Sequence, residues 1–290
     1  MKITEMFNKN RPVLSFEVFP PKKTSPIESI SEVLDELGQL KPDFISVTYG
    51  AAGNAANTDT IDICEKIKKK YGIESMAHLT CVHATRESVD IILEDLKKRD
   101  ITNILALRGD IVEGMEPQKD FLHASDLAEY IKAKSDIGVS GACYPEVHME
   151  ADSMREDIAN LKIKVDAGVE HLVSQLFFDN NCFYDFIEKV RIAGINVPVE
   201  AGIMPVTSKK QIERMVSMCG ASLPAKFSKV MQRFENNPEA LRDAGIAYAI
   251  DQIIDLVANG VDGVHIYTMN NPYIARKISE GVKNVIGHDI

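Results

Sequence analysis

The sequence lacks several features that mark membrane, secreted or nucleic-acid-binding proteins. It has no run of about 18 apolar residues that could form a transmembrane helix. No long apolar segment follows the lysine near its start, so we expect no secretory signal. Acidic residues outnumber basic ones, 43 to 33, and the formal net charge is −10. Nucleic acids and anionic membranes require a basic face. We therefore expect a cytoplasmic protein with no nucleic-acid or membrane partner.

Cysteine pairs and nucleotide-binding motifs are also missing. The cysteines are odd in number and far apart in the sequence, at Cys64, Cys81, Cys143, Cys182 and Cys219. This pattern favours buried free thiols in a reducing compartment over a disulfide framework. It offers no CxxC pair for zinc or an iron–sulfur cluster, and we expect no metal site. The chain contains neither GxGxxG nor GxxxxGK(S/T), so a nucleotide cofactor would not be held by a Rossmann or P-loop turn.

What the sequence does contain is an alternation of short apolar runs with longer amphipathic segments. The segments Ile27–Leu40, Thr58–Lys70 and Glu87–Lys98 are examples of the expected helices. Eight buried parallel strands in this order close a (β/α)8 TIM barrel, of the α/β class, and 290 residues suffice for one such domain over residues 1–290. The predicted strands are Val13–Phe19, Phe44–Thr48, Ser75–Leu79, Asn103–Leu107, Ser140–Cys143, His171–Leu176, Val197–Gly202 and Gly263–Tyr267.

One interval interrupts this alternation of strands and helices. Between Met204 and Gly260 there is room for three helices, near Ser208–Met218, Ala225–Arg233 and Pro238–Ala258. We interpret the interval as extra helices inserted after strand 7 and not as a second domain, because the sequence shows no Gly/Ser-rich or Pro-rich linker.

Polar residues collect at the carboxyl ends of the predicted strands, where (β/α)8 enzymes carry their chemistry. Taken singly, Glu17 can be an exposed or salt-bridged strand residue and His78 a satisfied core histidine. Arg108 and Asp110 can be an ion pair at a turn. Their common position at one rim favours an active site instead. The rim residues are Glu17, Thr48, Tyr49, His78, Arg108, Gly109, Asp110, Tyr144, His148, Gln175 and Tyr267.

The segment after the fifth strand carries a second polar pattern. Its apolar stripe, expected to face the barrel, consists of Met154, Ile158, Leu161 and Val165. Gly168 is placed to end the helix. Asp157, Asn160 and Lys164 form a different stripe. This polar stripe is either a solvated face or a surface that contacts a bound cofactor, since Asn and Lys can bind ribose or phosphate oxygens.

Six segments together resemble the methylenetetrahydrofolate reductase family. They are SFEVFPP, VTYGA, HLTC, ALRGD, YPEVH and DAGVEHLVSQLFFD, and they occur in the family's order across essentially the whole chain. The resemblance implies a (β/α)8 barrel that binds flavin noncovalently, as FAD rather than FMN. It implies reduction of 5,10-methylenetetrahydrofolate to 5-methyltetrahydrofolate with NAD(P)H as hydride donor, by a compact chain that forms a homo-oligomer.

The resemblance also assigns roles to individual residues. Glu17 matches the family's acid and Asp110 the carboxylate near the flavin and the pterin, so both would contact substrate. Gln175 and Gln211 match folate-side contacts, and Asn271 stands at the folate tail. Cofactor contacts are implied for Thr48, Tyr49, Ala51, His78, Leu107, Arg108, Gly109, Asp110, Ala124, Tyr144, His148, Asp157, Asn160 and Lys164.

Three positions depart from the family's bacterial pattern. Ile163 and Asn271 stand where arginines often contribute to the cofactor site and to the folate tail site. Met215 stands where a phenylalanine can stack on the donor or the substrate. Because methionine orients a flat ring less firmly than phenylalanine does, an electron-donating partner protein is an alternative to NADH.

The two carboxylates suit the implied reaction. Opening the five-membered ring of the substrate requires a proton on the leaving amine, which Glu17 can supply. The iminium that forms is a cation, which Asp110 can stabilise. Three alternatives are another flavin barrel of proline dehydrogenase type, a pterin-binding transferase without flavin, and a flavin subunit that only passes electrons within a larger complex. Gln175 and Gln211 argue against the first, and the two carboxylates against the last.

Overall fold

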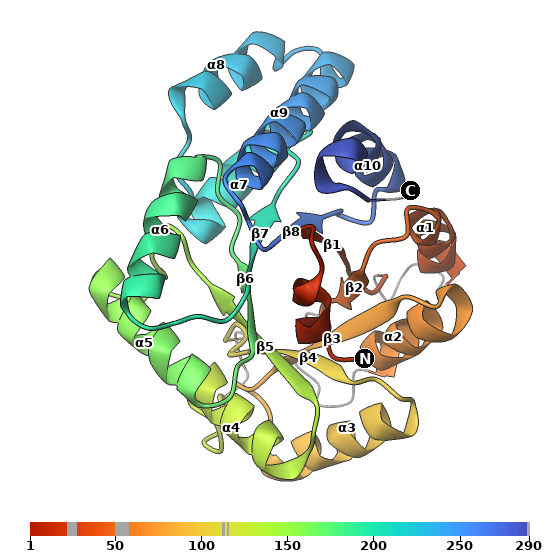
Figure 1. Ribbon diagram of the computed structural model, residues 1–290, viewed down its shortest axis with the longest axis vertical. Helices are drawn as coiled ribbons and strands as arrows, with labels where there is room; N and C mark the ends of the chain where they lie inside the picture. Colours follow the sequence, from red (N-terminus) through yellow and green to blue (C-terminus); the bar gives the residue numbers. More distant parts are fainter. Residues whose placement is uncertain (22–27, 50–57, 112–113, 115, 289–290) are drawn as a thin grey trace.

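The computed structural model describes residues 1–21, 28–49, 58–111, 114 and 116–288 (Figure 1). Eight parallel strands form a closed barrel in sequence order, which confirms the predicted (β/α)8 fold. The strands are β1 (Val13–Val18), β2 (Phe44–Val47), β3 (Glu74–Thr80), β4 (Asn103–Leu107), β5 (Gly138–Cys143), β6 (His171–Ser174), β7 (Val199–Ile203) and β8 (Gly263–Tyr267).

Helices surround this ring of strands (Figure 1), and the bounds of those predicted from the sequence agree with the structure to within one residue. A short 3-10 helix, η1 (Ile3–Asn8), precedes β1. The α-helices are α1 (Glu28–Gln39), α2 (Thr58–Tyr71), α3 (Arg86–Lys98), α4 (Ala124–Lys134), α5 (Met154–Asp166), α6 (Asn180–Ile192), α7 (Lys209–Cys219), α8 (Ala225–Phe234), α9 (Pro238–Ala258) and α10 (Pro272–Ile286).

Three helices lie between β7 and β8, as the sequence predicted. Helix α9 packs against β7 and beside α6 and α10, so it takes the place of the seventh outer helix, and α7 and α8 are the additions. A small apolar cluster joins them to the barrel, in which the rings of Phe178 and Phe227 stack 4.6 Å apart. Gly245 permits this packing, because a Cβ there would lie 1.7 Å from the Val206 carbonyl oxygen.

The predicted sixth strand, His171–Leu176, extends too far. Its regular structure ends at Ser174, so Gln175 follows the strand instead of lying within it. The physical reason is that Ser174 bonds through its side chain, since its hydroxyl accepts from the Gly202 N–H at 2.9 Å. The Tyr267 hydroxyl donates to the Ser174 carbonyl oxygen at 2.7 Å.

Side chains alternate between the helix layer and the barrel interior, as parallel strands require. At the amino-terminal end, η1 packs Ile3 and Met6 against an apolar cluster of the barrel interior. The Ile3 N–H donates to Asn103 Oδ1 at 2.9 Å, which fixes η1 under the barrel. The cluster also contains Val13, Phe44, Met76, Leu105 and Val173, and the last two reach the floor of the cleft described below.

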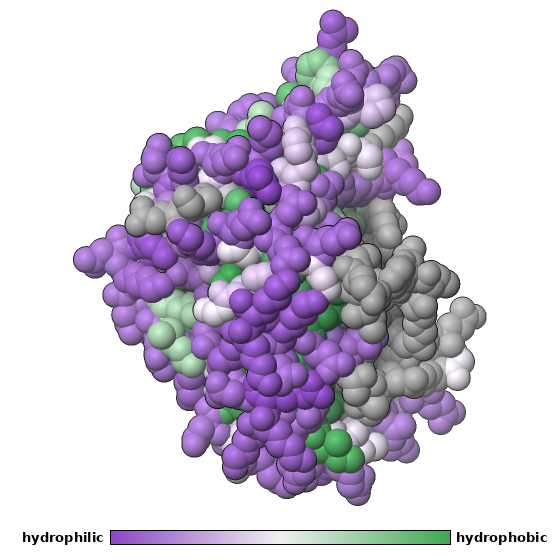
Figure 2. Space-filling view, turned by 90° about the vertical axis from the view of Figure 1, so that its right-hand side faces the viewer, coloured by the Kyte–Doolittle hydropathy of each residue, from purple (hydrophilic) through white to green (hydrophobic). Residues whose placement is uncertain are grey.

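All five cysteines are free thiols, as predicted, but only Cys64, Cys81 and Cys143 are buried, whereas Cys182 and Cys219 are half-buried. Burial raises the pKa of Cys64 and Cys143 to about 12, so these two thiols behave as small apolar groups. Within the described ranges, no helix is long and apolar enough to cross a membrane, and no cluster of His, Cys, Asp or Glu could hold a metal ion. Outside the grey residues, the face in Figure 2 is mainly hydrophilic, with small scattered apolar areas.

Candidate active site

The carboxyl ends of the strands open into a cleft with a volume of about 520 Å³. Because the strands are parallel, the residues that end them meet at one mouth of the barrel. Thr80, Met204 and Cys219 also line the cleft. The residues predicted from the sequence that the cleft brings together are Glu17, Thr48, Tyr49, His78, Leu107, Arg108, Gly109, Asp110, Tyr144, His148 and Gln175.

Glu17 lies between two histidines on the wall of this cleft. Its Oε2 atom is 3.6 Å from His78 Nε2 and 3.7 Å from His265 Nε2, and its side chain is 20% exposed. Burial lowers the pKa of His78 to about 4, although the Glu17 carboxyl opposes this shift, so His78 is neutral at neutral pH. In the described structure the buried Nε2 atom of His78 has no hydrogen-bond partner. The ring is thus not a fully satisfied core histidine, and its Nε2 atom is buried against Glu17.

Arg108 does not pair with Asp110, the structural alternative considered for these two residues. Its guanidinium forms a two-pronged ion pair with Glu150, with Nη2 donating to Oε1 at 2.7 Å. Asp110 is exposed and lines the cleft. Between them, Gly109 has a φ of +84°, and a Cβ there would lie 2.8 Å from the Thr80 side chain. Glycine is thus required for the chain to turn at the end of β4.

A second pocket, of about 490 Å³, continues the cleft toward α5. We call the two pockets together the groove. Their five shared lining residues are Leu107, Arg108, Ala142, Tyr144 and His148. The second pocket also contains Ala124, at the start of α4, and Ile163, which departs from the family pattern. It further contains the polar stripe of α5, namely Asp157, Asn160 and Lys164.

The polar stripe of α5 faces this groove, so the alternative of a purely solvated face is wrong. Lys164 Nζ donates to the Ala142 carbonyl oxygen at 2.8 Å, and burial lowers the pKa of its ammonium group. Asp157 accepts from the His148 N–H at 2.9 Å, and burial raises the pKa of its carboxyl. Asn160 is exposed at the edge. The α5 helix ends as predicted, with Gly168 at a φ of +109°.

The loop between β5 and α5 adds an aromatic pair to the groove. The rings of Tyr144 and His148 meet edge to face with their centroids 4.6 Å apart. His148 Nδ1 accepts from the Glu150 N–H at 3.2 Å, which places the proton of the neutral ring on Nε2. Val147 has a φ of +74°, which is costly for a β-branched residue. Such backbone strain is typical of functional sites.

A third pocket, of about 330 Å³, adjoins the cleft and shares Met215 and Tyr267 with it. It contains Gln211 and Asn271, whereas Gln175 lines the main cleft. Gln211 Oε1 accepts from the Thr207 N–H at 3.0 Å, and the Asn271 side chain caps α10. The predicted folate-side residues thus lie in two adjoining pockets. Ala51 lies outside the described residues.

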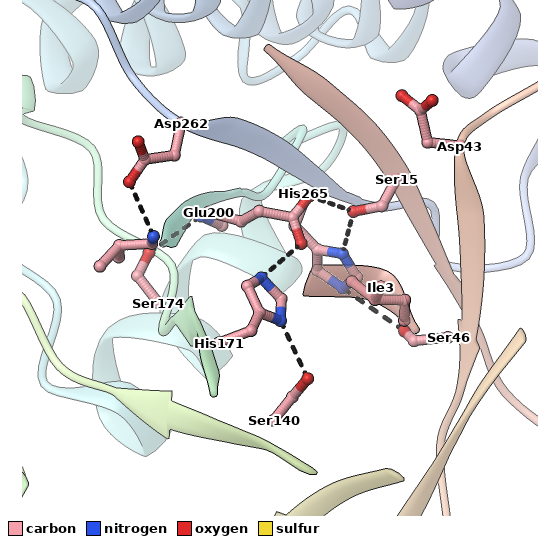
Figure 3. A network of polar contacts seen from close by, with 12 residues as sticks. Ile3, Ser15, Asp43, Ser46, Ser140, His171, Ser174, Glu200, Asp262 and His265 are labelled. Carbon is pink, nitrogen blue, oxygen red and sulfur yellow. Dashed lines mark hydrogen bonds and ion pairs between the residues drawn. The ribbon is translucent and has the colours of Figure 1, made fainter. Parts of the chain in front are cut away.

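A layer of buried polar residues that was not predicted from the sequence lies directly beneath the cleft (Figure 3). A signal was present, because Ser15 lies two positions before Glu17, and His265 two before Tyr267, on the same strand faces. The layer consists of Ser15, Ser46, Ser140, His171, Glu200 and His265.

Comparison with known proteins identifies sequence relatives over almost the whole chain. The family model for methylenetetrahydrofolate reductase matches residues 2–283. The chain is 37% identical to a 5,10-methylenetetrahydrofolate reductase of Pectobacterium carotovorum over 91% of its own length and 88% of that protein. It is 38% identical to the Escherichia coli K12 protein of the same name, over 89% and 86% of the two chains.

A plant relative is longer. The chain is 35% identical to methylenetetrahydrofolate reductase (NADH) 1 of Arabidopsis thaliana over 93% of its own length, but spans only 48% of that protein. Among solved structures, a Clostridium thermocellum protein described as binding two copies of 5-methyl-5,6,7,8-tetrahydrofolic acid superposes with a TM-score of 0.69 at 16% identity, covering 98% of both chains. This likeness concerns the fold alone.

Proposed function

Because this chain belongs to the methylenetetrahydrofolate reductase family, we propose that it reduces 5,10-methylenetetrahydrofolate to 5-methyltetrahydrofolate with a bound flavin. The observation that carries the proposal is that two pockets adjoin. The Glu17 carboxyl lies in a cleft that shares five lining residues with a second pocket, which is lined by Asp157, Asn160 and Lys164. One site can hold a reacting ring and an acid, and the other the polar half of a dinucleotide.

The residues of the groove fit FAD better than FMN. The second pocket offers a lysine, an asparagine and a carboxylate beyond Tyr144 and His148, and these suit ribose and phosphate oxygens. FMN, which has no adenosine half, would leave this pocket without a role. A bound flavin would supply hydride transfer, and NAD(P)H is the proposed source of the electrons.

In this proposal, different residues protonate, stabilise and orient the substrate. Glu17 donates a proton to the amine nitrogen that leaves when the five-membered ring opens. Asp110 stabilises the cation that results, because it places a carboxylate at the same cleft. Gln175 orients the pterin ring, and Gln211 and Asn271 orient the remainder of the folate from the adjoining pocket.

The proposal is tested with the purified chain loaded with FAD under anaerobic conditions. NADH or NADPH should bleach the flavin absorption band, and 5,10-methylenetetrahydrofolate should restore it with formation of 5-methyltetrahydrofolate. A chain that binds neither FAD nor FMN would contradict the proposal. So would a reduced flavin that methylenetetrahydrofolate leaves reduced, and that outcome would favour an electron-transferring subunit.

A further inference from the structure

The interior of the barrel beneath the cleft is polar, although bulky apolar residues usually fill this position. Ser15, His171, Glu200 and His265 are each 0% exposed. They come from β1, β6, β7 and β8, and their side chains point toward one another (Figure 3). Burying a carboxyl group away from water is costly, so a function for Glu200 must be sought in what it contacts.

The contacts form a continuous path to the catalytic cleft. Glu200 Oε1 lies 2.7 Å from Ser15 Oγ, and Ser15 Oγ lies 2.6 Å from His265 Nδ1. On its other side, His265 Nε2 lies 3.7 Å from Glu17 Oε2 and 3.5 Å from Ser46 Oγ. Glu200 is therefore linked to Glu17 through one hydroxyl and one imidazole.

A second histidine and an aromatic ring close the far end of this path. Glu200 Oε2 lies 3.1 Å from His171 Nε2, and His171 Nδ1 lies 2.9 Å from Ser140 Oγ. The Phe7 ring of η1 covers His171 at a centroid distance of 4.9 Å. His171 therefore faces the second carboxyl oxygen of Glu200 within the closed interior.

The donors along the path can be counted. The Ser15 hydroxyl donates its single proton to Glu200 Oε1. The Ser15 oxygen must then accept from His265, which places the imidazole proton on Nδ1. A neutral histidine carries one N–H, so Nε2 then has a lone pair, which faces both Ser46 Oγ and Glu17 Oε2.

We propose that Glu200 is a positioning residue for the acid Glu17. Through Ser15 it holds His265 in the Nδ1–H tautomer, which presents an unprotonated Nε2 to the Glu17 carboxyl 3.7 Å away. An unprotonated nitrogen facing this carboxyl favours its protonated form. The inference rests on the proposed function, in which Glu17 must hold a proton until the substrate ring opens. One proton passes from Glu17 to the substrate nitrogen in each turnover, and Glu17 regains it from water.

Two other groups also face Glu17 and share in setting its protonation. His78 of β3 lies 3.6 Å away and is neutral at neutral pH. Tyr267 of β8 pairs with Glu17 in the strand register, but its hydroxyl proton is already donated to the Ser174 carbonyl oxygen. His265 is therefore distinguished by its link to a second buried carboxylate.

The first test reads the tautomer directly. In the full-length, FAD-loaded protein with ¹⁵N-labelled histidine, the His265 signals are assigned by their absence in His265→Gln. We expect a protonated Nδ1 and an unprotonated Nε2. In Ser15→Ala the Nδ1–H loses its acceptor, so the proton should move to Nε2, and in Glu200→Gln both tautomers should appear. A wild-type His265 protonated on Nε2 would overturn the proposal, and this measurement needs no substrate.

The second test concerns the protonation of Glu17. It measures how the rate of flavin reoxidation by methylenetetrahydrofolate depends on pH. Ser15→Ala should lower the apparent pKa of this step by about one pH unit, because an Nε2–H donor favours the ionised carboxyl. Reduction of the flavin by NADH should keep its wild-type rate. The control is Ser75→Ala, the same change at another buried serine. Ser75 lies on the outward face of β3, away from Glu17, so this variant should leave the pH profile unchanged.

The outcomes separate the two proposals. If wild-type protein fails to reoxidise with folate, the proposed function fails while the tautomer measurement still stands. If wild-type protein reacts but Ser15→Ala and Glu200→Gln both keep its tautomer and pH profile, Glu200 is only structural. Should Ser15→Ala fail to fold, the wild-type and Glu200→Gln spectra still decide the question.

Discussion

Lys164 is anchored to the end of the barrel by a hydrogen bond from its Nζ to the Ala142 carbonyl oxygen, 2.8 Å away. The bond crosses from α5 to β5 and places a cation where the cleft meets the second pocket. The same helix carries Lys162 on a different face, paired with Asp166. Two lysines of one helix thus have distinct environments, and they can be compared in one experiment.

We predict that Lys164→Met weakens FAD binding roughly 10- to 100-fold, the equivalent of about 1.5–3 kcal/mol for one hydrogen bond to a charged group. The dissociation constant is measured by flavin fluorescence titration. Lys162→Met is the matched control and should bind FAD as the wild type does. Equal losses in both variants would indicate a damaged helix instead of a lost cofactor contact. Asn160→Ala should show a smaller loss of affinity.

Glu17→Gln should retain FAD and its reduction by the donor, but should lose folate reduction by about 10²- to 10⁴-fold. The amide has nearly the same shape as the carboxyl and cannot supply the required proton. Stopped-flow absorbance measures the two half-reactions separately. Normal reoxidation of the flavin by methylenetetrahydrofolate in this variant would remove Glu17 from the mechanism.

Asp110→Asn should behave differently from Glu17→Gln, because Asp110 is proposed to act through its charge. Loss of a negative charge near the ring should raise the flavin reduction potential, since the reduced flavin is anionic. The potential is measured by anaerobic titration against a reference dye. A potential equal to that of the wild type would place Asp110 away from the flavin.

Met215→Phe should accelerate reduction of the flavin by NADH and affect the folate half-reaction less. Met215 lies where the cleft meets the third pocket, so its side chain borders the space for a flat ligand. A phenylalanine ring can stack on nicotinamide and orient it, whereas methionine is flexible. The rate constant is read by anaerobic stopped-flow. If wild-type protein is already reduced by NADH as fast as folate reoxidises it, the alternative of a partner protein as donor is excluded.

The stability of the protein should fall between about pH 6.5 and pH 4 because of His78. Burial lowers the pKa of His78 to about 4, so the unfolded chain binds this proton first as the pH decreases. The destabilisation is therefore absent above about pH 6.5, grows as the pH falls, and reaches at most about 3 kcal/mol near pH 4. Urea unfolding at several pH values measures it. His78→Gln should show a shallower dependence in this window, and identical curves would contradict the assignment.

The sequence by itself determined the barrel and the rim of its active site. Short β-branched runs alternating with amphipathic helices can bury their apolar surfaces only in a parallel sheet with outer helices, and eight of them close it. Because parallel strands all end at one mouth, Glu17, His78 and Gln175 could be placed together without coordinates. The polar stripe of α5 followed from helical periodicity, which assigns residues to one face.

Only the tertiary structure decided which residues of different strands and helices contact one another in the barrel. Periodicity indicates that Ser15, Glu200 and His265 point inward, but not that they touch, since they lie up to 250 positions apart. Their contact depends on barrel closure, which brings β1, β7 and β8 side by side. The same holds for Arg108, whose partner is Glu150 and not the adjacent Asp110. Local sequence sets the face on which a side chain lies, whereas closure of the barrel selects its neighbours.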